Sequence, residues 1–125
     1  MSTSQGQFGA FLKELRARKR ITLREFCRRA DADPGNISRM ERGLLPPPQD
    51  EDILRRYAKA AEIAYGDDDW YRFVDFAAAD RGIVPQDLLS NKEVVGMLPV
   101  FFRTLRGTKP TEEEMRRLAE MIRRN

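Results

Sequence analysis

The stretch from Thr22 to Gly43 constrains the fold of this chain more than any other, because it encodes two short helices joined by a tight turn. Apolar residues of its first half recur at the i, i+3, i+4, i+7 spacing that gathers side chains on one helix face. These residues are Leu23, Phe26, Cys27 and Ala30. Thr22 and Glu25 form the capping-box pattern that begins a helix. The sequence therefore predicts a helix that starts at Leu23.

The second half of this stretch predicts a helix with one polar face. Asp33 can cap its first turn, Pro34 suits the first helical position, and Gly43 ends the helix. Ile37 and Met40 are spaced to point inward. The polar face consists of Asn36, Ser38, Arg39 and Arg42. A short helix with such a face fits the major groove of DNA, so the pattern indicates DNA binding.

The remaining apolar periodicity is helical, and no segment shows the alternation of a strand. We expect further helices over residues 6–19, 50–66, 67–80, 85–90, 92–97 and from 111 to the C-terminus. Pro99 is expected to break or restart the helix before it, and Thr111 with Glu114 forms a second capping box. The predicted fold class is all-α. It comprises a five-helix domain over residues 1–66 and a small helical region for dimerisation or partner binding over residues 67–125.

Composition excludes several function classes. The chain of 125 residues has no histidine, which excludes Ser-His-Asp and Cys-His catalysis and histidine metal sites. Its single cysteine, Cys27, cannot form an internal disulfide and is expected in the core. No apolar run reaches the roughly 20 residues of a membrane span, and the polar N-terminus lacks the apolar stretch of a signal peptide. We therefore expect a cytoplasmic, non-enzymatic protein with no metal, cofactor or membrane partner.

The charge distribution distinguishes the half that contains the paired helices. The formal net charge is +3. Residues 1–48 contain 10 Lys/Arg and 5 Asp/Glu, a net of +5, whereas residues 49–125 contain 13 and 15, a net of −2. A basic first half is the electrostatic pattern expected for contact with phosphates. Basic surfaces also serve solubility, so this observation supports DNA binding without carrying it alone.

Residues 8–66 resemble the helix-turn-helix domain of the Xre family, the phage Cro and repressor type. The matching features are Arg16, the run from Thr22 to Ala30, and the ending Ile37-Ser-x-Met-Glu-Arg-Gly43. The resemblance implies binding to a double-stranded DNA operator as a homodimer, with the second helix of the motif in the major groove. It also implies an ion pair between Arg16 and Glu41 that orients this helix.

Base contacts and phosphate contacts are expected from different parts of the motif. Asn36 can pair with adenine and Arg39 with guanine, while Gly35 and Ser38 complete the base-contacting set. Pro34 and Gly35 depart from the long polar residues frequent in the family, so base reading by side chains rests on fewer positions. Phosphate contacts are expected at the start of the first helix of the motif and at the flanking turns, from Lys19, Arg20, Thr22, Leu23, Arg24 and Arg42.

The C-terminal half carries less specific signals. Asp67–Asp69 and Glu112–Glu114 are interpreted as acids that complement helix N-termini rather than as metal ligands. Five aromatic residues either line a ligand pocket or belong to a core or a dimer contact: Trp70, Phe73, Phe76, Phe101 and Phe102. Two apolar stripes exceed what so short a segment can bury alone, so we expect them in a dimer or partner surface. They consist of Phe101, Phe102, Leu105, Met115, Leu118 and Ile122.

Three functional interpretations remain open, beside a less favoured interaction module that binds no DNA. The first is a repressor that occludes a promoter as a homodimer on an inverted-repeat operator. The second is an antitoxin that binds a toxin and represses its own operon. The third is a repressor inactivated when a partner metalloprotease cleaves its C-terminal region. The segment Leu105-Arg-Gly-Thr-Lys-Pro110 is similar to that of the third group.

Overall fold

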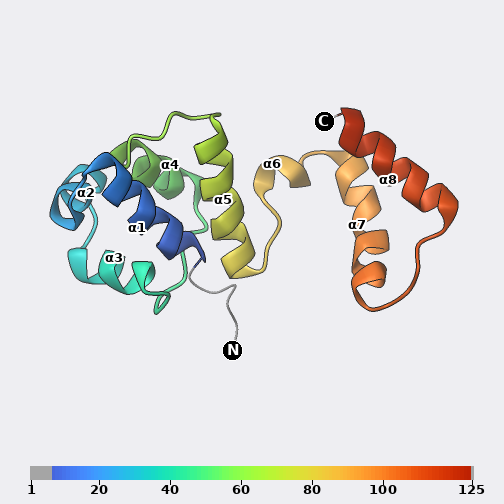
Figure 1. Ribbon diagram of the computed structural model, residues 1–125, viewed down its shortest axis with the longest axis horizontal. Coiled ribbons are helices and arrows are strands. Elements are labelled where there is room, and N and C mark those ends of the chain that lie inside the picture. The colour runs from blue at the N-terminus through green and yellow to red at the C-terminus, as the bar shows by residue number, and fades with distance from the viewer. Residues whose placement is uncertain (1–6, 125) are drawn as a thin grey trace. The chain divides into compact units, whose positions relative to one another are not determined.

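The computed structural model describes residues 7–124, and all regular secondary structure in this range is helical (Figure 1). The helices are α1 (Gln7–Lys19), α2 (Leu23–Ala30), α3 (Pro34–Glu41), α4 (Glu51–Ala60), α5 (Asp68–Arg81), α6 (Gln86–Leu89), α7 (Lys92–Leu105) and α8 (Glu112–Arg124). They divide into two compact units, the first ending at Val84 and the second beginning at Pro85. The all-α fold class predicted from the sequence is confirmed.

Local side-chain caps begin α2, α3 and α4 of the first unit. The Thr22 hydroxyl accepts a hydrogen bond from the backbone N–H of Glu25 at 3.0 Å, and the Asp33 carboxylate accepts one from that of Asn36 at 2.9 Å. Asp50 caps the first turn of α4 in the same way. Each cap satisfies a backbone donor that has no partner inside its own helix. The helix starts are therefore set locally by single side chains.

The core of the first unit is built from one apolar face of each of its helices. Its largest fully buried side chains are Phe8, Leu12, Leu15, Phe26, Ile37 and Phe73. Cys27 is buried among them, and burial raises the pKa of its thiol because the thiolate would lose its hydration. The only cysteine is therefore a packing residue of the core.

α5 belongs to this first unit, whereas the sequence predicts a boundary after residue 66. The ring centroids of Phe8 and Phe73 lie 4.7 Å apart, and those of Phe11 and Phe76 lie 5.2 Å apart, so α5 packs along α1. At the end of α5, a carboxylate oxygen of Asp80 accepts a hydrogen bond at 2.9 Å from the backbone N–H of Phe8. Asp80 thereby caps α1 from 72 positions away.

α4 ends at Ala60, earlier than the predicted end near Gly66. Glu62 has a left-handed φ of +61°, the N–H of Ile63 donates to Ala58 O at 2.8 Å, and that of Glu62 donates to Lys59 O at 3.0 Å. These two bonds are those of the Schellman motif that ends a helix. Glutamate here replaces the glycine usual in the left-handed position, which is why the sequence pattern did not reveal the stop.

Two helices of the first unit approach each other closely at Gly9 in α1. A Cβ atom at this position would lie 2.1 Å from the carbonyl oxygen of Met40 and 2.7 Å from Cα of Glu41. Only a residue without Cβ allows the backbones to come this close. Gly9 therefore sets how deeply the C-terminal end of α3 sits against α1. No local sequence pattern marks this role of Gly9.

The second unit consists of the short helix α6 and a helical hairpin of α7 and α8. α7 continues through Pro99, whereas the sequence predicts a break or restart there. A proline inside a helix removes one backbone hydrogen bond, but α7 packs against α8, where Met97 and Met121 are buried. The predicted capping box of α8 is present. Thr111 and Glu114 exchange hydrogen bonds of 2.9 and 3.1 Å between side chain and backbone.

Candidate nucleic-acid interface

α2 and α3 are the two helices of the helix-turn-helix pattern, and α3 presents a polar face to solvent. Ile37 and Met40 are buried against the core, which fixes the rotation of α3 about its axis. Asn36, Arg39 and Arg42 are exposed on the opposite side, whereas Ser38 is half-buried. The rotation therefore offers long polar side chains to a partner molecule along a single face.

Two of the predicted base-contacting residues contact each other. Nη2 of Arg39 donates a hydrogen bond of 2.7 Å to Oδ1 of Asn36. A Cβ atom at Gly35 would lie 3.7 Å from both terminal guanidinium nitrogens of Arg39. The arginine therefore lies back along α3 toward its N-terminal end, in the space that Gly35 leaves open. Gly35, Asn36 and Arg39 form one cluster at the start of the helix.

The start of α2 keeps backbone donors available for an anion. The N–H groups of Glu25 and Phe26 bond to Thr22, to its hydroxyl and its carbonyl respectively. Within residues 7–124, the N–H groups of Leu23 and Arg24 form no hydrogen bond. The exposed Arg24 side chain lies beside them. A helix N-terminus with two free amides and an arginine is suited to hold a phosphate.

The other predicted phosphate contacts are placed differently. The Lys19 ammonium donates to the backbone carbonyl of Glu62, so its charge is held near the loop that follows α4. Arg20 is exposed, with a left-handed φ of +58° at the end of α1. Nε of Arg42 donates at 3.3 Å to the carbonyl of Ser38 and is otherwise exposed. Arg20, Arg24 and Arg42 are therefore the cations with the greatest freedom to meet phosphates.

The predicted ion pair between Arg16 and Glu41 is present with bidentate geometry. Nε and Nη2 of Arg16 each lie 2.7 Å from a different carboxylate oxygen of Glu41, and Nη1 donates to the carbonyl of Ile21 at 3.0 Å. The side chains are 12% and 5% exposed, and the hydrogen bond to Glu41 raises the pKa of Arg16. The pair joins α1, the turn before α2 and the end of α3. We assign it an orienting role, since buried pairs contribute little net stability.

Two arginines that the sequence analysis did not identify join α2 to α4. Nε of Arg56 donates to the carbonyl of Ala30 at 2.7 Å. Nη1 of Arg29 donates to the carbonyl of Ala60 at 3.2 Å and to the Glu62 carboxylate at 3.1 Å. Both satisfy carbonyls at helix C-termini, where a cation also complements the helix dipole. No local sequence pattern marks these contacts, because they join segments about 30 residues apart.

The predicted dimer or partner surface lies in the second unit and is largely exposed. Leu105 and Ile122 are the most exposed, at 70% and 66%. Phe101, Phe102 and Met115 are also exposed, while Leu118 is half-buried. Within residues 85–124, only Met97 and Met121 are buried apolar side chains. The hairpin therefore leaves most of its apolar area in contact with solvent.

Residues 7–64 match a family model described as a helix-turn-helix domain. The match includes all of α1 to α4 and stops before α5. No curated protein and no solved structure matches the chain. No helix of residues 7–124 is both long and apolar enough to cross a membrane. The chain thus contains an N-terminal helix-turn-helix domain, a class of domain that binds DNA with its second helix in the major groove.

Proposed function

We propose that this chain is a sequence-specific transcriptional repressor of the Xre type, which binds an inverted-repeat operator in the cytoplasm as a homodimer. The observation that carries the proposal is the outward face of α3 within the matched domain, with Asn36 and Arg39 at its N-terminal end. In helix-turn-helix proteins this end of the second helix contacts base edges. Repression follows most simply from occupation of a promoter.

Arg39 is the proposed base reader of α3, and Asn36 supports it. A guanidinium can donate two parallel hydrogen bonds to O6 and N7 of guanine. The bond from Arg39 uses Oδ1 of Asn36, which is the atom that asparagine would need to accept from adenine N6. This bond occupies one of the two acceptor positions of Oδ1, so Asn36 is less free to form the bidentate contact with adenine. We therefore propose guanine recognition by the pair.

Binding to phosphates is assigned to the start of α2, to Arg20 and to Arg42. Such contacts fix the register of a protein on DNA without reading its sequence. Because each neutralised phosphate releases counterions, the affinity should fall steeply as salt is raised. A flat salt response of the full chain on duplex DNA would contradict the proposal.

The decisive experiment distinguishes a residue proposed to contact bases from one proposed to contact phosphates. The operator is first identified by capturing fragmented host DNA with the full chain and sequencing it. Arg39→Ala is expected to cost about 1–3 kcal/mol on this site and to relax preference at one base pair. Arg24→Ala should weaken matched and mismatched duplexes alike, and Arg117→Ala on exposed α8 serves as the control. Identical behaviour of the Arg39 and Arg24 variants would exclude α3 as the reading helix.

Dimerisation is assigned to the second unit. A segment of about 40 residues rarely forms a stable core alone without disulfides, metals or oligomerisation, and this one has no cysteine. α8 carries Glu112–Glu114 in its first turn and Arg123 and Arg124 in its last. Two copies of α8 running antiparallel about a two-fold axis would bring opposite charges together. The exposed apolar side chains would then be covered by the same surface of a second copy.

Sedimentation of the full chain tests this assignment. Leu105→Glu and Ile122→Glu should convert a dimer into a monomer at micromolar concentration. Leu44→Glu is the matched control, because Leu44 is 62% exposed but lies in the first unit. A monomeric parent chain would instead favour partner binding through these residues, as in an antitoxin that holds a toxin.

Proteolytic inactivation is the second candidate mechanism, favoured by the connector between α7 and α8. Residues 101–109 are all exposed, and Leu105 at the end of α7 is 70% exposed. Cleavage there by a regulatory metalloprotease would separate α8 from α7 and remove half of the proposed dimer surface. Intact-mass spectrometry of the chain isolated from its host should then detect a fragment that ends between residues 105 and 110. The full-length mass alone under all growth conditions would exclude this mechanism.

A further inference from the structure

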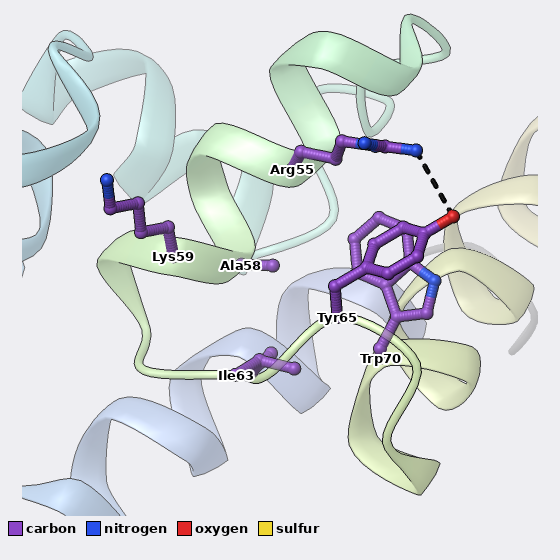
Figure 2. Close-up of a pocket in the computed structure, with 6 residues that line it drawn as sticks. All are labelled: Arg55, Ala58, Lys59, Ile63, Tyr65 and Trp70. Atoms are coloured by element: carbon purple, nitrogen blue, oxygen red, sulfur yellow. Dashed lines mark hydrogen bonds between the residues drawn. The ribbon is translucent and has the colours of Figure 1, made fainter.

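A cavity of about 270 Å³ lies in the first unit between α4 and the segment that leads into α5 (Figure 2). It is lined by Arg55, Ala58, Lys59, Ile63, Tyr65 and Trp70. None of these residues belongs to α2 or α3. The helix-turn-helix match ends at residue 64, so both aromatic residues lie beyond it. The aromatic part of the cavity wall is therefore a feature of this chain beyond the matched domain.

Two neighbouring side chains, Arg55 and Trp70, hold Tyr65 in the wall of the cavity. Nη2 of Arg55 donates a hydrogen bond of 3.1 Å to the Tyr65 hydroxyl, and the guanidinium lies 4.3 Å from the centre of the tyrosine ring. The Tyr65 and Trp70 ring centroids are also 4.9 Å apart, with the ring planes inclined at 43°. Tyr65 is nevertheless 64% exposed, whereas Trp70 is only 5% exposed. An exposed aromatic ring fixed by these two neighbours adds a preformed apolar surface to the wall of the cavity.

The charge on the cavity wall is positive and incompletely balanced. Its lining contains two cations and no acidic residue. Glu51 pairs with Arg55 at 2.7 Å and offsets its charge. The Lys59 ammonium forms no hydrogen bond or ion pair with any residue from 7 to 124. Figure 2 shows the Lys59 side chain directed away from the Tyr65–Trp70 pair, so its flexible stem must turn for the ammonium to meet an occupant of the cavity. This arrangement suits a molecule with an apolar body and a single negative charge.

We propose that this cavity is an effector site for a small organic carboxylate with a flat apolar body, of the size of an arylacetate. The body packs on Tyr65 and Trp70, with Ala58 and Ile63 beneath it, and the carboxylate pairs with Lys59. The volume lies just below the range of pockets that bind drug-sized molecules, so a smaller molecule is the appropriate occupant.

The segment that forms one wall of the cavity also contacts the helix-turn-helix. The Glu62 carbonyl accepts from Lys19 at the end of α1, and the Glu62 carboxylate accepts from Arg29 in α2 at 3.1 Å. Ile63 and Tyr65, which line the cavity, follow directly in the chain. An occupant that shifts this segment therefore acts on residues next to the phosphate-binding start of α2. This effector role rests on the proposed DNA binding, whereas occupation of the cavity does not.

Trp70 is the only tryptophan of the chain, so its fluorescence reports on the cavity in the full-length protein. We expect a saturable change with phenylacetate and about tenfold weaker binding of phenylacetamide, its neutral counterpart. Lys59→Gln should weaken phenylacetate binding about tenfold and leave phenylacetamide unchanged. Lys109→Gln in the second unit is the matched control. Amide resonances of residues 55–70 should shift in a ¹H–¹⁵N spectrum of the full chain with phenylacetate.

Each of these measurements has an outcome that would overturn its part of the proposal. Equal binding of the acid and the amide, an unaffected Lys59→Gln variant, or resonance shifts that leave residues 55–70 unchanged would exclude a carboxylate site here. The absence of a saturable response to both phenylacetate and benzoate would exclude a site for this class of ligand. In a separate titration on operator DNA, saturating phenylacetate should change the affinity of the parent chain but not that of Lys59→Gln. An unchanged affinity would exclude the effector role, and a chain that binds no DNA would instead refute the proposed function.

Discussion

Arg39 shows how the position of a reading side chain depends on its neighbours at the scale of single residues. The residue four positions before it, Gly35, leaves the space that the guanidinium occupies, and Asn36 accepts a hydrogen bond from it. An arginine held by a neighbour loses less side-chain entropy when it binds a base. If Arg39 contacts a base as proposed, we expect Asn36 to contribute to recognition without touching that base.

A double-mutant cycle should reveal this dependence. We expect Asn36→Ala and Arg39→Ala to be non-additive, with a coupling energy of about 0.5–3 kcal/mol for operator binding. The reason is that each single change removes the same orienting hydrogen bond. Ser38→Ala with Arg39→Ala is the comparison cycle, and binding isotherms on the selected operator provide the four affinities. Additive losses in the Asn36 cycle would mean that the two residues act on DNA independently.

The two helical glycines that differ most in their surroundings offer a second prediction. Gly9→Ala should destabilise the first unit by about 1–3 kcal/mol or more, because its Cβ would overlap the backbone of α3. Gly96→Ala is the matched control, since nothing lies within 4 Å of a Cβ there. That exposed change should instead stabilise α7 by up to about 1 kcal/mol through helix propensity. Urea unfolding of the two variants measures both effects, and equal midpoints would contradict the close approach.

Individual helices are stabilised by caps at their ends and by hydrogen bonds between side chains on their own surfaces. On α2, Glu25 accepts hydrogen bonds from Arg28 and Arg29, and these bonds lower the pKa of its carboxyl to about 2. The unfolded chain would have the ordinary value of 4.5. A carboxyl with a depressed pKa in the folded state contributes stability above its unfolded pKa and loses it as the pH falls toward its folded pKa.

The pH dependence of unfolding should therefore separate Glu25 from an ordinary surface glutamate. Glu25→Gln is expected to lower the urea midpoint at pH 7, with the gap to the parent chain closing between about pH 4.5 and pH 2. Glu14→Gln is the control, because Glu14 is exposed on α1 and pairs with no residue of the described chain. A gap that persists unchanged at low pH would mean that the arginine contacts do not stabilise α2.

The elements could be predicted well wherever their signals are local. Thr22, Asp33, Asp50 and Asn91 cap the helices that the sequence predicts after them, because a capping side chain and its backbone donor lie within three residues. The end of α4 was missed because glutamate takes the left-handed position of a Schellman motif. The break expected at Pro99 was wrong, because packing on α8 outweighs the lost hydrogen bond.

At the scale of the whole molecule, the division of the chain depends on contacts that no local pattern reveals. The sequence predicts the Arg16–Glu41 pair only through family resemblance, and it gives no sign of Gly9 or Asp80. The boundary expected after residue 66 lies two residues beyond the end of the family match, but the compact unit continues to Val84. Contacts between α1 and α5 connect residues about 65 positions apart, and only the three-dimensional structure brings them together.

Truncation should make this division measurable. A chain that ends at Val84 is expected to unfold cooperatively with the stability of the first unit. A chain that ends at Gly66 loses Trp70, Phe73 and the Asp80 cap, so we expect it to lose more than about 3 kcal/mol. Circular dichroism during urea unfolding compares the two. Similar stability of both chains would show that the helix-turn-helix needs only residues up to 66.

The hydrogen bond from Phe8 to Asp80 also affects the order of events during synthesis. A protein leaves the ribosome N-terminus first, at about 5–20 residues per second, and its early segments begin to fold while later ones are still being made. α1 anchors α3 through Gly9 and Arg16. Asp80, which caps α1, is added to the growing chain 72 residues after Phe8. A nascent chain that has completed the motif but not α5 would therefore hold its reading helix loosely. A DNA-binding protein built in this way would compete for DNA only after most of its length has been translated.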